Sequence, residues 1–181
     1  MMEVKIPFYN ILNMFLTGLV FIAAFLFILP DCQMSEEIVE FGKLIISLPD
    51  VISTVLFFAV AYEIGLVINR VGSVALERAL KGMKCIPMEI SYVLFNKTKE
   101  KYPIMNVLSR EYALSRTGMV LFFSLLVMAL CAAKFVEALI FAAIVVVFFY
   151  SCKKHSDKIS ELILSELEEK DKPESQNEVT A

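Results

Sequence analysis

The chain has 181 residues, of which 58% are hydrophobic and 20% charged, and its formal net charge is −3. Soluble domains are typically about half apolar and about a quarter charged, so this composition is shifted toward a protein that contacts lipid. The apolar residues also form long uninterrupted blocks, and this distribution excludes an ordinary soluble domain.

The first block, Ile6–Pro30, contains 25 residues without a charge. At about 1.5 Å per residue it spans the ~30 Å hydrocarbon core of a bilayer. A cleaved signal has a shorter apolar run of about 7–15 residues and a small-residue cleavage motif, which is missing before Asp31. We therefore expect a retained transmembrane helix.

The second block, Leu44–Ile68, is interrupted by Asp50 near its start and Glu63 near its end. Pro49 precedes the longest apolar stretch, and proline is tolerated in the first turn of a helix because its missing N–H has no partner there. The sequence predicts a second span whose helix continues out of the membrane and ends at Gly82.

The third block, Thr117–Cys152, has 36 residues and only two charges, Lys134 and Glu137, near its middle. One straight helix of this length would measure about 54 Å, which is more than a bilayer requires. We therefore predict a tight hairpin with both charges at its turn. Its two spans are expected at about 117–133 and 135–152.

Two further helices are predicted outside the membrane. Pro103 opens a helix, 104–116, that enters the third span without a break, and with the extension of the second span it forms a stalk or cap. In 156–169, Ser156 is a suitable N-cap, and one face carries Ile159, Leu162, Ile163 and Leu167. This face can pack on the chain's own cap or on a neighbouring subunit. Residues 170–181 are expected to be disordered.

Charge asymmetry predicts the orientation. Segment 69–116 has nine Lys or Arg against four Glu, whereas loop 31–43 has four acidic residues and one lysine. Because positive loops stay in the cytoplasm, we expect a multi-pass inner-membrane protein with both termini cytoplasmic.

The expected fold class is all-α, with about four transmembrane helices and helical cytoplasmic extensions. The parts are helices 1 and 2 with an acidic outer loop (1–68), the cytoplasmic cap (69–116), the hairpin of helices 3 and 4 (117–152), and an amphipathic helix with its tail (153–181).

The sequence offers no enzyme site. It has one histidine, His155, and no P-loop, GxGxxG, HExxH, GxSxG or CxxC motif. Paired intramembrane aspartates are excluded because Asp50 is the one aspartate within a predicted span. The four cysteines have no metal-type spacing. We therefore expect a protein without catalytic residues, metal or cofactor.

The most informative residue is Glu63, which lies about one or two turns inside the predicted cytoplasmic boundary. A charge at this depth costs several kcal/mol unless it is paired or wetted. Its expected partners are Arg110 and Arg116, and Arg70 lies on nearly the same helix face. One interpretation is a structural ion-pair cluster, and the other is a gate or a ring in an ion pathway.

Two other polar groups are candidates for contacts. Asn10 and Asn13, spaced i, i+3, are suited to hydrogen bonds between membrane helices or subunits. The basic run Lys97, Lys99 and Lys101 is expected to bind anionic lipid headgroups, because it is tethered beside a membrane. Few aromatic side chains accompany these lysines, so the sequence disfavours nucleic-acid binding by this run.

The stretches AYEIGLVINRVGSVALE (61–77) and YPIMNVLSREYALSR (102–116) resemble small multi-pass inner-membrane proteins of bacterial anti-phage defence cassettes. The resemblance implies an oligomeric component that senses infection or perturbs the membrane and works with a cytosolic protein encoded nearby. Two functions are therefore predicted. The first is a non-enzymatic homo-oligomer that forms a pore or perturbs the membrane. The alternative is a membrane-anchored sensor or scaffold that docks a cytosolic partner through its cap.

Overall fold

The computed structural model describes residues 8–28, 40, 43, 47–83 and 92–171, which are helical apart from short turns. The elements are α1 (Phe8–Ile28), α3 (Asp50–Val71), the π-helical η2 (Gly72–Leu76), α4 (Glu77–Gly82), α5 (Tyr92–Lys101), α6 (Ile104–Cys131) and α7 (Phe135–Asp171). Among the described residues, four helices are long and apolar enough to cross a membrane, namely α1, the continuous rod α3–η2–α4, α6 and α7. The prediction of an all-α polytopic membrane protein is confirmed.

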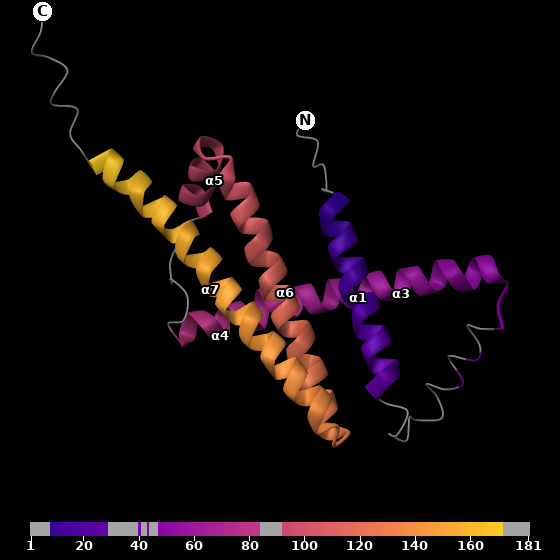
Figure 1. Cartoon of the computed structure of the whole chain (residues 1–181). Helices are drawn as coiled ribbons and strands as arrows, with labels where there is room; N and C mark the ends of the chain where they lie inside the picture. Colours follow the sequence, from indigo (N-terminus) through magenta and orange to yellow (C-terminus); the bar gives the residue numbers. More distant parts are fainter. Residues whose placement is uncertain (1–7, 29–39, 41–42, 44–46, 84–91, 172–181) are drawn as a thin grey trace, which may run out of the picture.

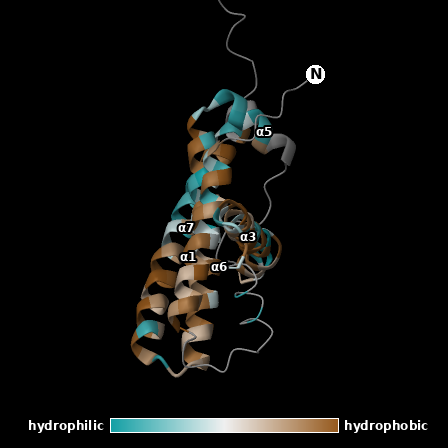
Figure 2. Cartoon of the chain, turned by 90° about the vertical axis from the view of Figure 1, so that its right-hand side faces the viewer, coloured by the Kyte–Doolittle hydropathy of each residue, from teal (hydrophilic) through white to brown (hydrophobic). Residues whose placement is uncertain are grey.

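The helices do not form a parallel bundle. In Figure 1, the axes of α1, α6 and α7 are inclined similarly, with α7 antiparallel to α6, and the rod α3–η2–α4 crosses them. Figure 2, turned by 90°, shows α3 nearly end-on beside the upright α6 and α7, so the steep crossing holds in both views. The rod continues to Gly82, as predicted, but it leaves the bundle sideways.

Helices α6 and α7 form the predicted hairpin. They are joined at residues 132–134, where Ala133 has a positive φ of 55° that reverses the chain. Lys134 lies in this turn and donates a hydrogen bond of 3.1 Å to the carbonyl of Phe27 at the end of α1. Glu137 lies instead in the first turn of α7, where a negative charge favours the helix dipole. Stacked rings of Phe122 and Phe148 join the two helices, with centroids 5.7 Å apart.

Helices α1 and α3 touch through their backbones. A Cβ placed on Gly18 would lie 1.7 Å from the carbonyl oxygen of Ala61, and a Cβ placed on Gly65 would lie 1.7 Å from that of Met14. Glycine at both positions therefore allows the two helices to cross at van der Waals contact, as small residues do in membrane proteins. The N-terminal half of α3 extends beyond this crossing, and Val51, Ile52, Val55, Phe57 and Phe58 are exposed there.

The expected end of the fourth helix at Cys152 and a new helix starting at Ser156 are both wrong. Helix α7 runs from Phe135 to Asp171 without interruption. It contains no glycine or proline that would break it, and Ser156 accepts through its carbonyl an internal hydrogen bond of 3.0 Å from the Ser160 hydroxyl. Ser156 is therefore an interior residue and not an N-cap.

We call α5, residues 104–112 of α6 and residues 156–167 of α7 the cap. Its buried core consists of Met105, Leu108, Ile159 and Ile163, with Phe95, Tyr112 and Leu162 packed against it. The apolar face of residues 156–167 thus packs against α5 and α6 of the same chain, except that Leu167 is exposed. Figure 2 shows many hydrophilic residues at this end of the hairpin.

The extension of the second span was expected to join the cap, and this is wrong. Leu80 of α4 packs instead with Met119 and Cys152, in a separate core, because the crossing at Gly65 directs the rod across the hairpin. The predicted acidic loop 31–43 lies outside the described residues, apart from positions 40 and 43. Of the segment 170–181 that was expected to be disordered, residues 170–171 belong instead to the last turn of α7, and residues 172–181 lie outside the described residues.

Candidate functional site

A largely buried ion pair lies where the rod crosses α6. Arg116 donates to Glu77 with a distance of 2.5 Å from Nη1 to Oε2, and the side chains are only 12% and 24% exposed. Lys81 also contacts Glu77, at 3.0 Å, and the Arg116 guanidinium lies 5.7 Å from the ring centre of Tyr112. The pair is thus held in a largely dehydrated setting, where removal of one partner is costly.

The π turn in η2 explains why Glu77 reaches this site. Asn69, eight residues earlier, accepts a hydrogen bond of 3.0 Å from the Thr117 hydroxyl, so both side chains face α6. In a regular α-helix, residues eight apart differ in direction by about 80°. A π turn absorbs one extra residue, which reduces the difference to about 20°. The buried Gly72 leaves room for the Arg116 side chain, which lies 3.4 Å from a Cβ built there.

The predicted pairing of Glu63 with Arg110 or Arg116 is wrong. Arg116 binds Glu77, and Glu63 is exposed and lines a groove of about 620 Å³ between α1, α3 and α6. The groove's other lining residues are apolar except for Ser124, whose hydroxyl bonds to its own helix. Glu63 does not meet these arginines because the steep crossing turns Ile68 toward the core of α6 and leaves Glu63 on a side face of α3. Arg70 is also exposed.

The remaining predicted site residues meet elsewhere. Asn10, Asn13, Lys99 and Arg110 line one groove of about 490 Å³ between α1, α5 and α6. Within the described parts of the chain, no hydrogen bond joins the two asparagine side chains to another helix, so their predicted role as interhelical contacts stays a prediction.

The three predicted headgroup lysines differ in environment. Lys101 forms an ion pair of 2.8 Å with Glu166, Lys97 is exposed, and Lys99 is partly buried at the groove. One basic run on α5 is thus divided between a cap contact, open surface and a groove.

Sequence reasoning missed Glu77 and the glycine crossing. The sequence did contain a signal for the glycine crossing, because Ala61 and Gly65 form the small-xxx-small spacing that allows close helix contact. It contained no signal for Glu77, because the pairing of Glu77 depends on a π turn that no local motif in 72–76 predicts.

No protein-family model, curated protein or solved structure shows detectable similarity to this chain. The resemblance to membrane components of defence cassettes therefore stays a prediction.

Proposed function

We propose that the protein is a non-enzymatic sensor or scaffold of the bacterial inner membrane that docks a cytosolic protein through its cap. The continuity of α6 and α7 carries this proposal. Helix α7 has 37 residues, which is about 55 Å of helix, and a hydrocarbon core of ~30 Å accounts for little more than half of it. The same helices therefore build the spans and the cap core, so a tilt in the membrane moves the cap.

The rigidity of this connection can be measured as a distance. One spin label is placed on the native, exposed Cys131 at the hairpin turn and one on Glu161→Cys in the cap, with the other cysteines removed. We expect a narrow distance distribution in vesicles. A Gly-Gly insertion after Lys154 should broaden it, because glycine lowers helix stability by about 1 kcal/mol per residue. A broad distribution in the chain without the insertion contradicts the proposal.

Docking is tested by photo-crosslinking in cells from position 161, on the exposed side of the cap, with the exposed Leu139 near the hairpin turn as the control position. A protein adduct specific to position 161 supports the scaffold. Lipid adducts alone at both positions overturn it.

The proposed orientation places both termini and the cap in the cytoplasm, supported by the positive charge of 69–116. With the native cysteines replaced by serine, a membrane-impermeant thiol reagent should in intact cells label Ser35→Cys and leave Lys97→Cys unlabelled until the cells are opened. Labelling of position 97 alone reverses the topology.

A homo-oligomer that forms a permeation path is the second candidate. It is favoured by Glu63, a carboxylate exposed on the flank of an apolar membrane helix, since such residues usually face a protein interior or a water-filled cavity. Assembly through this face would enclose the carboxylates. We then expect an oligomeric mass in mild detergent and dye leakage from vesicles that Glu63→Gln alters. A monomeric mass across concentrations, with no leakage, eliminates this function.

Either function fits the anti-phage defence setting that the resemblance implies. Cells that carry the gene with its genomic neighbours should survive phage challenge better than cells with the gene deleted. Equal survival removes this setting and leaves the molecular proposals standing.

A further inference from the structure

The groove between α1, α5 and α6 gathers polar side chains from three helices. It is lined by Tyr9, Asn10 and Asn13 of α1, by Lys99 of α5 and by one face of α6 within residues 106–114, among them Arg110, and its volume is about 490 Å³. Three carboxamides, two hydroxyls and two cationic groups lie among the lining residues, which include no carboxylate. A groove with this chemistry offers hydrogen-bond donors and positive charge together.

The two cations differ from Arg116 and Lys101 in their partners. Arg116 contacts Glu77 and Lys101 contacts Glu166. Neither Lys99 nor Arg110 has a carboxylate partner among the residues that the structure describes. Their positive charge is therefore available to a bound anion.

The guanidinium of Arg110 is also held in place. It lies 5.4 Å from the centre of the Tyr9 ring, a cation–π contact that restricts its position. A planar guanidinium binds a phosphate through two parallel N–H donors, and a lysine adds a point charge. Asparagine side-chain amides supply further donors for oxyanion oxygens.

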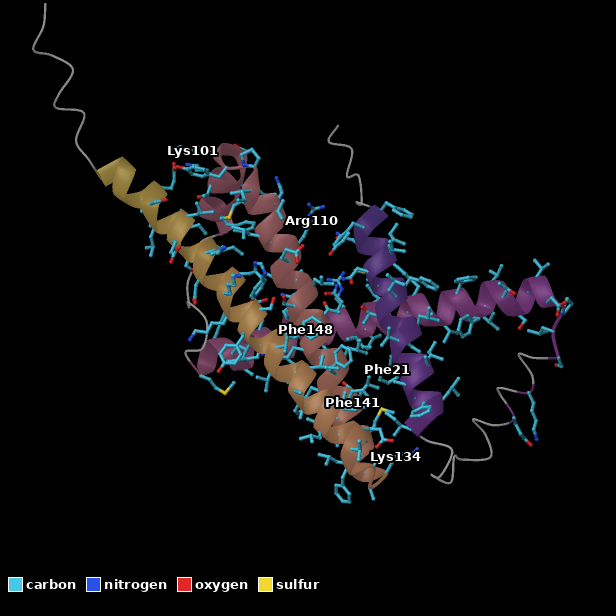
Figure 3. The ribbon with its side chains drawn as sticks, viewed as in Figure 1. Phe21, Lys101, Arg110, Lys134, Phe141 and Phe148 are labelled. Carbon is cyan, nitrogen blue, oxygen red and sulfur yellow. The ribbon has the colours of Figure 1, made fainter. Side chains whose placement is uncertain are left out.

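The groove lies at one end of the membrane-spanning part of the chain. Tyr9 belongs to the first turn of α1, and Lys134 binds the carbonyl of Phe27 at the other end of the same helix. Figure 3 shows Arg110 on the side of α6 that faces the beginning of α1, far from Lys134 at the hairpin turn. Since α1 has 21 residues, about the length that crosses a hydrocarbon core, its first turn is at headgroup depth.

We propose that this groove is a binding site for a phosphate-type oxyanion, with Arg110 and Lys99 as its charged ligands and Asn10 and Asn13 as neutral donors. The phosphate comes either from the headgroup of an anionic phospholipid or from a soluble phosphate. The site stands independently of the proposed docking and permeation functions, because it rests on the groove alone.

The test uses the purified full chain in phosphatidylcholine vesicles, with phosphatidylglycerol included in one arm and inorganic phosphate added in the other. Binding is followed as an increase in thermal stability and by the retention of lipid in native mass spectrometry. Stabilisation in the first arm only identifies a lipid headgroup, and stabilisation in both identifies the phosphate group itself. No stabilisation in either arm overturns the proposal.

Variants separate a built site from general surface charge. Arg110→Gln and Lys99→Gln are compared with Lys97→Gln and Lys153→Gln, which remove the same charge from exposed positions outside the groove. We expect the groove variants to bind at least about tenfold more weakly than these controls, which corresponds to ~1.4 kcal/mol. Lys99→Gln leaves the Arg110–Tyr9 contact intact, so it remains informative if Arg110→Gln unfolds. Equal weakening in groove variants and controls contradicts the site.

Discussion

The hairpin α6–α7 and the crossed pair α1–α3 hold their helices together in different ways. The hairpin helices pack through side chains along much of their length, from the Phe122–Phe148 stack to the cap core. The crossed pair depends on a short region in which Gly18 and Gly65 bring two backbones together. A contact between side chains can adjust when a group is added, whereas a contact between backbones cannot. The two pairs should therefore respond very differently to the same small substitution.

The largest effect is expected from Gly65→Ala. Its Cβ would lie 1.7 Å from the carbonyl oxygen of Met14, so the helices must separate. We expect a loss at or above the upper end of the ~1–3 kcal/mol typical of overpacking, measured by denaturant unfolding in mild detergent. Gly82→Ala is the control, because nothing lies within 4 Å of its added Cβ, and it should be neutral or slightly stabilising. A tolerated Gly65→Ala would disprove the backbone contact.

The next effect concerns the ion pair that joins the rod to the hairpin. Glu77→Ala leaves Arg116, which is 12% exposed, without its carboxylate, and we expect a cost of about 2–3 kcal/mol. Arg116→Ala should cost less, about 1–2 kcal/mol, because Lys81 still contacts Glu77 at 3.0 Å. In a double-mutant cycle the combined loss should fall below the sum of the two. Additive losses, or the opposite order of the single variants, would show that the two side chains act independently.

Gly118→Ala sharpens the comparison within the hairpin. Its Cβ would lie 2.6 Å from an atom of the Phe148 ring, which is the outer end of a side chain and can turn away. The strain is offset by the gain in helix propensity, up to about 1 kcal/mol, so the net loss should stay below about 1 kcal/mol. Adding Phe148→Leu should relieve the remaining strain. If Gly118→Ala costs as much as Gly65→Ala, the two pairs do not differ in the way described.

The smallest effect is expected from Ser151→Ala. It removes the hydrogen bond of 2.8 Å between the Ser115 and Ser151 hydroxyls, and such bonds between membrane helices average about 0.6 kcal/mol. Thermal unfolding of the variant beside Ser109→Ala, whose hydroxyl donates to the carbonyl of Asn106 in its own helix, isolates the interhelical part. A loss of unfolding free energy above about 2 kcal/mol for Ser151→Ala would contradict the minor role that we assign to the Ser115–Ser151 hydrogen bond.

The sequence predicted those parts of the fold that depend on local pattern. Long charge-free blocks identified the spans, and Lys134 between two apolar runs identified the hairpin turn. The direction of α3 was not predictable in this way, because it depends on how closely Gly65 meets the backbone of α1. The continuity of α7 was missed because Ser156 is a good N-cap wherever a helix begins, and nothing local says whether one begins there.

The candidate site was predictable in its residues more than in its pairings. Arg110, Lys99 and both asparagines were identified as polar groups near the membrane boundary, but their convergence requires the parallel placement of α1 against α6. The partner of Arg116 was assigned to Glu63 because both were expected at the same depth. The steep crossing moves Glu77 into that position instead.

The π turn in η2 has a consequence for how the chain tolerates insertions and deletions. A helix that holds one residue more than its fixed neighbours require stores the surplus as such a turn. Deleting the exposed Ser73 should therefore give a regular α-helix in which Asn69 and Glu77 still face α6. A deletion in the tightly crossed part of α3 cannot be absorbed in this way, because that part contains no π turn and contacts fix the helix faces on both sides of Gly65. Length changes in this protein should thus be accepted at Gly72–Leu76 and rejected a few turns earlier.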